Sequence, residues 1–292
     1  MNAAWEGLLL IDKPSGPTSH DIVADVRRTT GERRIGHTGT LDPLATGLLP
    51  LVLGRATRLA RFLPHAPKTY RGELLLGMET TTDDVTGVVR RNHTGEVPET
   101  AAVLRAAHEL EGEQLQSPPS VSARHVGGQR LYRLARRGVT VVAPAAPISV
   151  GRFELEPAAE AGRFCFTAEV SAGTYIRALI RDLGGLLGCG GTLVSLRRLA
   201  IGPMRIEHAV GWPSPPAALA AALVEPARMP LEPPPVELAA PEDARRFLAG
   251  TPLRLEADPL AAGYRRVLTR EGRFLGVGEA EAGLLRPRVV LG

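Results

Sequence analysis

The stretch that most constrains this chain runs from Gly36 to Gly54 and reads GHTGTLDPLATGLLPLVLG. Its first dozen residues hold three glycines and one proline, all close to a single carboxylate, Asp42. A glycine-rich loop lets its backbone approach a ligand closely. Pro43 stiffens the chain directly after the acid and favours extended geometry at Asp42 itself.

The residues that follow this loop predict a buried strand. Residues 48–53 form a continuous apolar run, the pattern of a strand that is buried on both faces. The sequence therefore predicts an acid on a rigid loop that core residues brace. By itself the spacing leaves two interpretations of Asp42 open. It is either a functional carboxylate or a side chain that caps the turn through Thr40 or the amides of Ala45 and Thr46.

Composition excludes several classes of protein. The 292 residues suffice for one large and one small domain, and an apolar fraction of 44% supports a real core. No apolar run is long enough for a transmembrane helix, and the N-terminus does not read as a signal peptide, so we expect a cytoplasmic protein. Two cysteines and scattered histidines predict neither a disulfide framework nor a metal site.

The net charge of +4 is a modest excess for a nucleic-acid-binding protein, so the clustering of basic residues matters more than their sum. The most basic stretch covers residues 116–138, where Tyr132 and His125 interleave with arginines. Such interleaving suits a phosphate backbone, whereas the alternative is a solvated arginine face on a short helix. The arginines concerned are Arg124, Arg130, Arg133, Arg136 and Arg137.

Lysine is almost absent from the chain. Of the 35 basic residues only Lys13 and Lys68 are lysines. Arginine carries a planar, wide guanidinium, whereas lysine carries a compact point charge. Either these two positions exclude arginine, or the two lysines persist by chance.

Apolar periodicity and the placement of Gly and Pro predict alternating strands and helices. The predicted strands are residues 7–11, 48–53, 69–76, 163–170 and 194–201. Four helices are predicted. The first starts at Thr18 or Ser19 and ends at Gly31, and the next two cover residues 55–63 and 99–111. The fourth follows Ser171 and is capped by Thr174. Arg177 and Arg181 are four apart and therefore lie on one side of this last helix.

Asp83 and Asp84 are paired carboxylates within a polar, threonine-rich stretch. A metal site would need a third acidic ligand, and none stands nearby. The pattern therefore favours a turn or a helix cap.

Eight prolines between residues 213 and 235 predict a domain boundary. The predicted domains are residues 1–235, with an insertion near 116–145, and residues 236–292. The second domain is predicted to consist of short strands around turns such as 270–272 and 276–278.

Three stretches resemble the bacterial tRNA pseudouridine-55 synthases of the TruB type: LLLIDKPSGPTSHDIV, the Asp42 loop and SAGTYIRALIRDLG. The resemblance covers most of residues 7–205, and the C-terminal residues resemble a PUA-type RNA-binding module more weakly. It implies an α+β fold, with a large mixed, mainly antiparallel sheet flanked by helices and a small C-terminal β-rich PUA-like domain. It also implies a monomer that needs no cofactor and acts on the T-arm of tRNA.

The resemblance implies a role for each site residue. Asp42 would be the nucleophile, and Arg177 would pair with it, because a buried carboxylate needs a nearby cation to stay ionised. Tyr70 would stack on the uracil, and His37 would hold the extruded nucleotide. Further residues would line or support the pocket, namely Lys13, Tyr175 and Leu199. The chemical step that Asp42 performs stays open. It either attacks the base, attacks C1′ of the ribose, or assists the departure of the uracil from the sugar.

Two other interpretations compete with this one. A non-catalytic RNA-binding or tRNA-folding protein on the same scaffold should have lost Asp42, Tyr70 or Arg177, and all three are present. A phosphate-binding NTPase is excluded because no GK[ST] follows the glycines.

Overall fold

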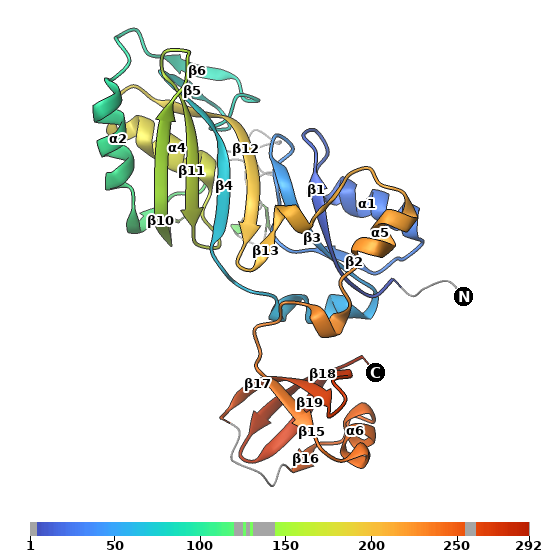
Figure 1. Cartoon of the computed structure of the whole chain (residues 1–292). Helices are drawn as coiled ribbons and strands as arrows, with labels where there is room; N and C mark the ends of the chain where they lie inside the picture. Colours follow the sequence, from blue (N-terminus) through green and yellow to red (C-terminus); the bar gives the residue numbers. More distant parts are fainter. Residues whose placement is uncertain (1–4, 120–124, 127–128, 131–143, 255–260, 292) are drawn as a thin grey trace. The chain divides into compact units, whose positions relative to one another are not determined.

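The computed structural model describes residues 5–119, 125–126, 129–130, 144–254 and 261–291 (Figure 1). The chain divides into two compact units. The first unit comprises residues 1–42, 48–64 and 206–292, and the second comprises residues 43–47 and 65–205. None of the described helices is long and apolar enough to cross a membrane.

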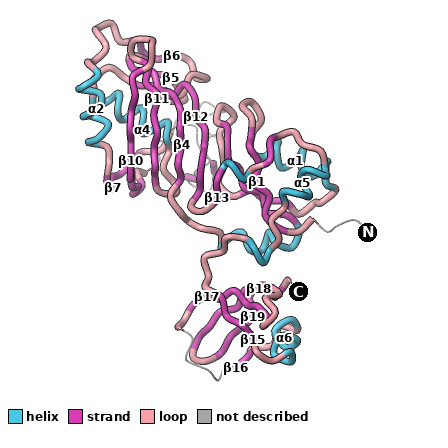
Figure 2. The backbone as a smooth tube through the Cα atoms, viewed as in Figure 1, coloured by secondary structure: helices cyan, strands magenta, loops and turns pink. Residues whose placement is uncertain are grey.

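The second unit is built on a sheet with the strand order β7-β10-β11-β4-β12, in which every neighbouring pair is antiparallel. Figure 2 shows these strands in magenta. Their bounds are β4 (Lys68–Leu76), β7 (Gly112–Gln116), β10 (Ala146–Pro157), β11 (Arg163–Val170) and β12 (Gly191–Ile201). Two helices pack on this sheet and contact each other, α2 (Thr100–Glu109) against β10 and α4 (Ile176–Leu186) against β12.

The described part of the second unit also contains pairs of short strands. β13 (Met204–Arg205) pairs with β12, β5 (Met78–Thr80) pairs with β6 (Val89–Asn92), and β8 (His125–Val126) pairs with β9 (Gln129–Arg130). All three pairings are antiparallel.

Alternation along β11 places its apolar side chains in the core, as the sequence predicts. Phe164, Phe166, Ala168 and Val170 are buried, whereas Cys165 lies on the other face and is partly exposed. Successive side chains of a strand point to opposite faces of the sheet, so a strand with one buried face alternates apolar and more polar residues.

Strand β3 (Thr46–Leu53) begins in the second unit and continues in the first. Thr46 and Gly47 pair in parallel with Arg197 and Arg198 of β12. Gly47 has a φ of 98°, and a Cβ at this position would lie 2.3 Å from the carbonyl oxygen of Arg198. Backbone conformation and close approach of the chain therefore both require glycine here.

We expect Gly47→Ala to lower the free energy of unfolding by about 2 kcal/mol or more, because the methyl group would strain φ and displace the backbone of β12. Urea denaturation measures this loss as a lower midpoint. Gly36→Ala in the same motif is the matched control, because no atom lies within 4 Å of its added Cβ. An unchanged midpoint in Gly47→Ala would contradict the close approach.

The N-terminal part of the first unit contains β1 (Gly7–Lys13), α1 (Ser19–Thr30) and β2 (Ile35–His37). β1 pairs in parallel with β14 (Val210–Gly211), and β2 pairs antiparallel with β3. The predicted ends of α1 are confirmed. Thr18 and Asp21 form a capping box at its start, and Gly31 ends it with a left-handed φ of 74°.

The helix predicted over residues 55–63 is a 3₁₀ helix, η1 (Gly54–Phe62). Three short elements follow where the chain returns to this unit: η2 (Ile206–His208), α5 (Pro216–Ala222) and η3 (Pro226–Arg228).

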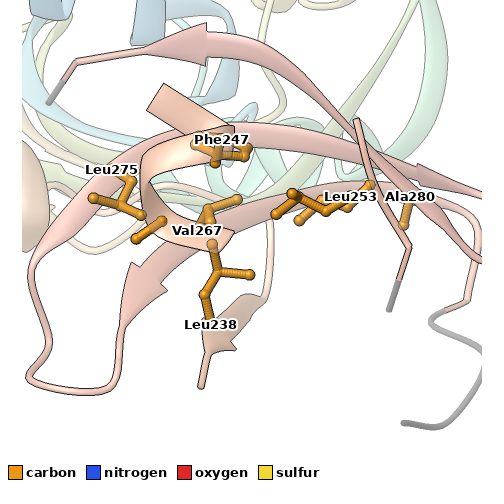
Figure 3. Packing of buried hydrophobic residues seen from close by; sticks show 8 residues of the cluster. Leu238, Phe247, Leu253, Val267, Leu275 and Ala280 are labelled. Atoms are coloured by element: carbon orange, nitrogen blue, oxygen red, sulfur yellow. The ribbon is translucent and has the colours of Figure 1, made fainter. Parts of the chain in front are cut away.

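The C-terminal residues form a five-stranded sheet in the order β15-β17-β18-β19-β16, with α6 (Pro241–Leu248) packed on it. The strands are β15 (Pro235–Leu238), β16 (Leu253–Arg254), β17 (Gly263–Thr269), β18 (Phe274–Glu281) and β19 (Leu284–Val290). Figure 3 shows its core, in which Phe247 of α6 meets Leu238, Val267 and Leu275 from the strands.

The predicted turn at residues 270–272 is confirmed, because it joins β17 to β18. The turn predicted at residues 276–278 is wrong, because these residues lie inside β18. There Gly276 permits close approach of β19, since an added Cβ would lie 1.9 Å from the carbonyl oxygen of Val289. Glycine in a strand therefore marks backbone contact here and not a turn.

The predicted fold class is confirmed. The described strands pair mainly antiparallel, with parallel pairings between β12 and β3, between β1 and β14 and between β15 and β17, and the C-terminal residues are rich in strands. The predicted domain boundary between residues 235 and 236 stays a prediction.

Candidate active site

The backbone directly before Asp42 is held by the first residue of α1. The Ser19 hydroxyl donates to the carbonyl oxygen of Leu41 at 3.0 Å and accepts from the Leu41 amide at 2.8 Å. Ser19 and Leu41 are both buried. The start of α1 therefore fixes the residue next to the half-buried carboxylate of Asp42.

The chain after Asp42 is held in the second unit. The Thr46 hydroxyl donates to the carbonyl oxygen of Leu196 at 3.3 Å, beside the parallel pairing of β3 with β12. The segment after the acid is thus tied to a strand within a few residues. The sequence predicted that core residues brace the Asp42 loop, and β12 supplies part of that bracing.

Lys13 places a buried cation in the same unit as Asp42. Its Nζ donates to the carbonyl oxygens of Pro14 and Pro17, both at 2.8 Å. Burial lowers the pKa of Lys13 to about 8, while the negative charges of Asp42 and Asp21 act in the opposite direction. Lys13 therefore organises its own loop and, when protonated, attracts the Asp42 carboxylate.

Arg177 lies in the first turn of α4 and is buried in the second unit. Its Nη1 donates to the carbonyl oxygen of Thr82 at 2.7 Å, and its Nε lies 3.6 Å from Oδ2 of Asp84. The side chains of this ion pair are only 5% and 7% exposed. Asp84 is therefore a partner of Arg177 that the sequence did not identify, and the pairing of Arg177 with Asp42 stays a prediction.

Asp84 also organises the turn from which it reaches Arg177. Its Oδ1 accepts hydrogen bonds from the Thr82 hydroxyl at 2.8 Å and from the Thr86 amide at 3.0 Å. The other carboxylate oxygen, Oδ2, faces Arg177. The prediction that the paired carboxylates build a turn is confirmed, and Asp84 in addition neutralises a buried guanidinium.

Asp83 joins the same turn to β12 and to α4. Its φ of 60° lies in the left-handed region, which residues other than glycine rarely adopt. Its carbonyl oxygen accepts from the Leu193 amide at 3.1 Å, and its carboxylate lies 3.3 Å from Nη1 of Arg181. Burial raises the pKa of Asp83, while Arg181 and Arg177 act in the opposite direction. Both arginines of α4 thus reach one turn, as their spacing predicts.

Tyr70 on β4 lies directly opposite Arg198 on β12, and both residues are buried. Lys68 is two residues before Tyr70 and therefore shares its face of the strand. Burial, together with the positive charge of Arg198, lowers the pKa of Lys68 to about 8. Both lysines of the chain thus occupy desolvated positions. In such positions the pKa of an ammonium shifts readily, whereas a guanidinium stays charged.

The other predicted site residues are distributed over three elements. His37 is half-buried in β2, Leu199 is half-buried in β12, and Tyr175 is the N-cap of α4. The predicted cap by Thr174 is therefore wrong. The Thr174 hydroxyl instead shares a hydrogen bond of 3.1 Å with the hydroxyl of Ser171.

The predicted RNA-gripping arginines cannot be placed. Arg130 belongs to β9, of which only the backbone is described. The others lie outside the described residues, namely Arg124, Arg133, Arg136 and Arg137. Within the described part of the chain, no group of three or more His, Cys, Asp or Glu side chains is arranged to hold a metal ion.

Three family descriptions match the chain. Residues 27–176, just over half of it, match the TruB family pseudouridylate synthase N-terminal domain. Residues 177–214 match the tRNA pseudouridylate synthase B C-terminal domain, and residues 234–291 match the pseudouridine synthase II TruB C-terminal family.

Individual relatives agree with these matches. A tRNA pseudouridine synthase B of Synechococcus sp. (strain WH7803) is 40% identical over 299 residues, which cover 97% of each chain. One from Mycobacterium bovis (strain BCG / Pasteur 1173P2) is 44% identical over 212 residues, covering 72% of this chain and 71% of the relative.

A solved structure shares the fold. The crystal structure of a Cbf5-Nop10-Gar1 complex contains a chain with a TM-score of 0.70 and 25% identity, covering 94% of this chain and 78% of that one. Together with the relative that aligns over 97% of the chain, the family matches show that this protein belongs to the TruB family of pseudouridylate synthases.

Proposed function

We propose that this protein converts one uridine of tRNA, at position 55 in the T-loop, into pseudouridine. The observation that carries the proposal is the alignment of the chain, over 97% of its length, with a relative named tRNA pseudouridine synthase B. Asp42 within its glycine-rich loop and a buried arginine at the start of α4 are consistent with this activity.

The chemistry is an isomerisation. The N1–C1′ bond of uridine breaks, the uracil turns, a C1′–C5 bond forms, and the proton on C5 is released while N1 gains one. No electrons are transferred, so the reaction requires no redox partner. A carboxylate that acts as a nucleophile divides this change into easier steps, and we assign that role to Asp42.

The remaining site residues bind the nucleotide or support Asp42. We assign the stabilisation of the carboxylate to Arg177, stacking on the uracil to Tyr70, and the holding of the extruded nucleotide to His37. Further residues complete the pocket, namely Lys13, Tyr175 and Leu199. In this proposal the guanidinium of Arg177 attracts the carboxylate of Asp42.

The target uridine must leave the stack of the folded T-loop before it reacts. Base flipping costs a few kcal/mol, which phosphate contacts and stacking offset. We propose that these phosphate contacts come from the arginine-rich segment and the C-terminal module. The arginines are Arg124, Arg130, Arg133, Arg136 and Arg137. Acting on tRNA, the protein would work in the cytoplasm, and we propose that it does so as a monomer without metal or cofactor.

Release of the C5 hydrogen tests this function. A T-arm RNA labelled with tritium at C5 of its uridines should lose label to water in the presence of EDTA, at about one uridine per T-loop. The released label is separated from the RNA and counted, and the modified position is mapped.

Two outcomes would contradict the proposal. If the protein bound the RNA but released no label, it would be a non-catalytic RNA-binding protein. A requirement for ATP, or for magnesium beyond the folding of the RNA, would indicate another chemistry.

A further inference from the structure

Gln116 forms an unusual link between a strand and a helix. It is the last residue of β7, where it pairs with Ala146 of β10, and it is 3% exposed. Its Oε1 accepts from the Tyr175 amide at 2.8 Å, and its Nε2 donates to the Tyr175 carbonyl oxygen at 3.2 Å. One carboxamide thus satisfies both backbone groups of a residue that is 59 positions away.

The residue that Gln116 binds is the N-cap of α4. The Tyr175 side chain makes no capping hydrogen bond, so the helix start depends on a partner from elsewhere. Arg177 stands two residues further on, with its guanidinium on Thr82 and Asp84. Gln116 therefore fixes the main chain that carries two of the proposed nucleotide-binding residues.

A second contact joins α4 to the residue that directly follows β7. Nη2 of Arg181 donates to the carbonyl oxygen of Ser117 at 2.9 Å, while its Nη1 lies 3.3 Å from Asp83. The end of β7 is thus attached to α4 through a helix N-cap and through a side chain. Two attachments define the rotation of the helix as well as its position.

We propose that Gln116 is a positioning residue for the reaction: its carboxamide holds the first turn of α4 so that Tyr175 and Arg177 face the reacting nucleotide. The inference rests on the proposed function, because both residues are assigned to the same site.

The contact with Tyr175 needs both the carboxamide and the length of a glutamine side chain. A carboxamide presents one acceptor and one donor side by side, which is what the amide and carbonyl of one residue require. Methionine has a similar length but neither group. Asparagine keeps the carboxamide but is shorter by one carbon–carbon bond, about 1.5 Å, and does not span the present distance.

Steady-state kinetics of tritium release from C5-labelled T-arm RNA test the proposal. In Gln116→Met and Gln116→Asn we expect kcat to fall by about 10²-fold, the size of loss that a small misplacement of reacting groups produces. KM should change by less than about threefold, because the residues that grip the RNA backbone are untouched. A partly unfolded population would also lower the apparent kcat at an unchanged KM, so a thermal melt of each variant gives the folded fraction and kcat is normalised to it.

Gln114→Met is the matched control. Gln114 lies two residues earlier on β7, and its Nε2 donates to the carbonyl oxygen of Leu110 and not to α4. We expect its kcat and KM to equal those of the wild type. If Gln116→Met does not fold, Gln116→Asn decides the question with the same readout.

The outcomes separate the two proposals. Wild-type protein that releases no label would refute the proposed function and this inference with it. An active wild type whose Gln116 variants keep kcat, lose only affinity, or lose no more than Gln114→Met would overturn the inference alone.

Discussion

Replacing Asp42 by Asn should reduce multiple turnover to background, a loss on the order of 10⁴-fold or more, because an amide lacks the negative charge that a nucleophile needs. The change removes charge and almost no volume. Affinity for T-arm RNA should therefore change by less than about tenfold, or 1.4 kcal/mol. Tritium release measures the rate, and filter binding measures the affinity.

Asp25→Asn is the matched control for this variant. Asp25 lies on α1, where its carboxylate forms a surface ion pair with Arg28. Asp25→Asn removes the same charge from the same unit as Asp42→Asn, and we expect its turnover rate to equal that of the wild type. Measurable multiple turnover by Asp42→Asn would show that another group is the nucleophile.

Arg177→Lys should reduce the single-turnover rate at saturating RNA by about 10²-fold, since a small misplacement near the reacting groups already costs this much. Lysine keeps the charge but lacks the planar fork that reaches Thr82 and Asp84 together. The variant should still fold, because Asp84 keeps a cation nearby. Truncation to Ala would instead leave a buried charge unpaired, at a cost of about 3–5 kcal/mol.

Arg163→Lys provides the comparison for this experiment. Arg163 forms ion pairs with Glu73 on β4 and with Glu160 in the turn between β10 and β11 of the same unit. We expect it to keep the wild-type rate. A wild-type rate in Arg177→Lys would show that catalysis does not need the guanidinium. A thermal melt of each variant separates a loss of rate from a loss of structure.

The sequence alone determined the elements whose signals are local. The cap at Thr18 and the left-handed Gly31 bound α1 as predicted, because both signals act within a few residues. The alternation in β11 fixed which face is buried, because side chains alternate by geometry in any strand. Family motifs made Asp42 and Arg177 candidate site residues, and both their roles and their pairing stay predictions.

Other features could not be read from the sequence. Asp84 was identified as a turn residue but not as the partner of Arg177, and the carbonyl of Thr82 that Arg177 also binds is 95 positions away. Local signals predicted Thr174 as the cap of α4, whereas Gln116 supplies the contact. Glycine in β18 suggested a turn until the pairing with β19 showed a close backbone contact.

The physical reason is the range over which each constraint acts. Helix caps and strand periodicity depend on backbone groups within one or two turns of the chain, so a sequence displays them directly. The partner of a buried charge or an unpaired amide depends on which strands and helices become neighbours, and burial then demands that such a partner exist. The sequence thus determined that the chain has an acid on a braced loop and an arginine on a helix, and only the tertiary structure decided that Asp84 and Gln116 hold that helix in place.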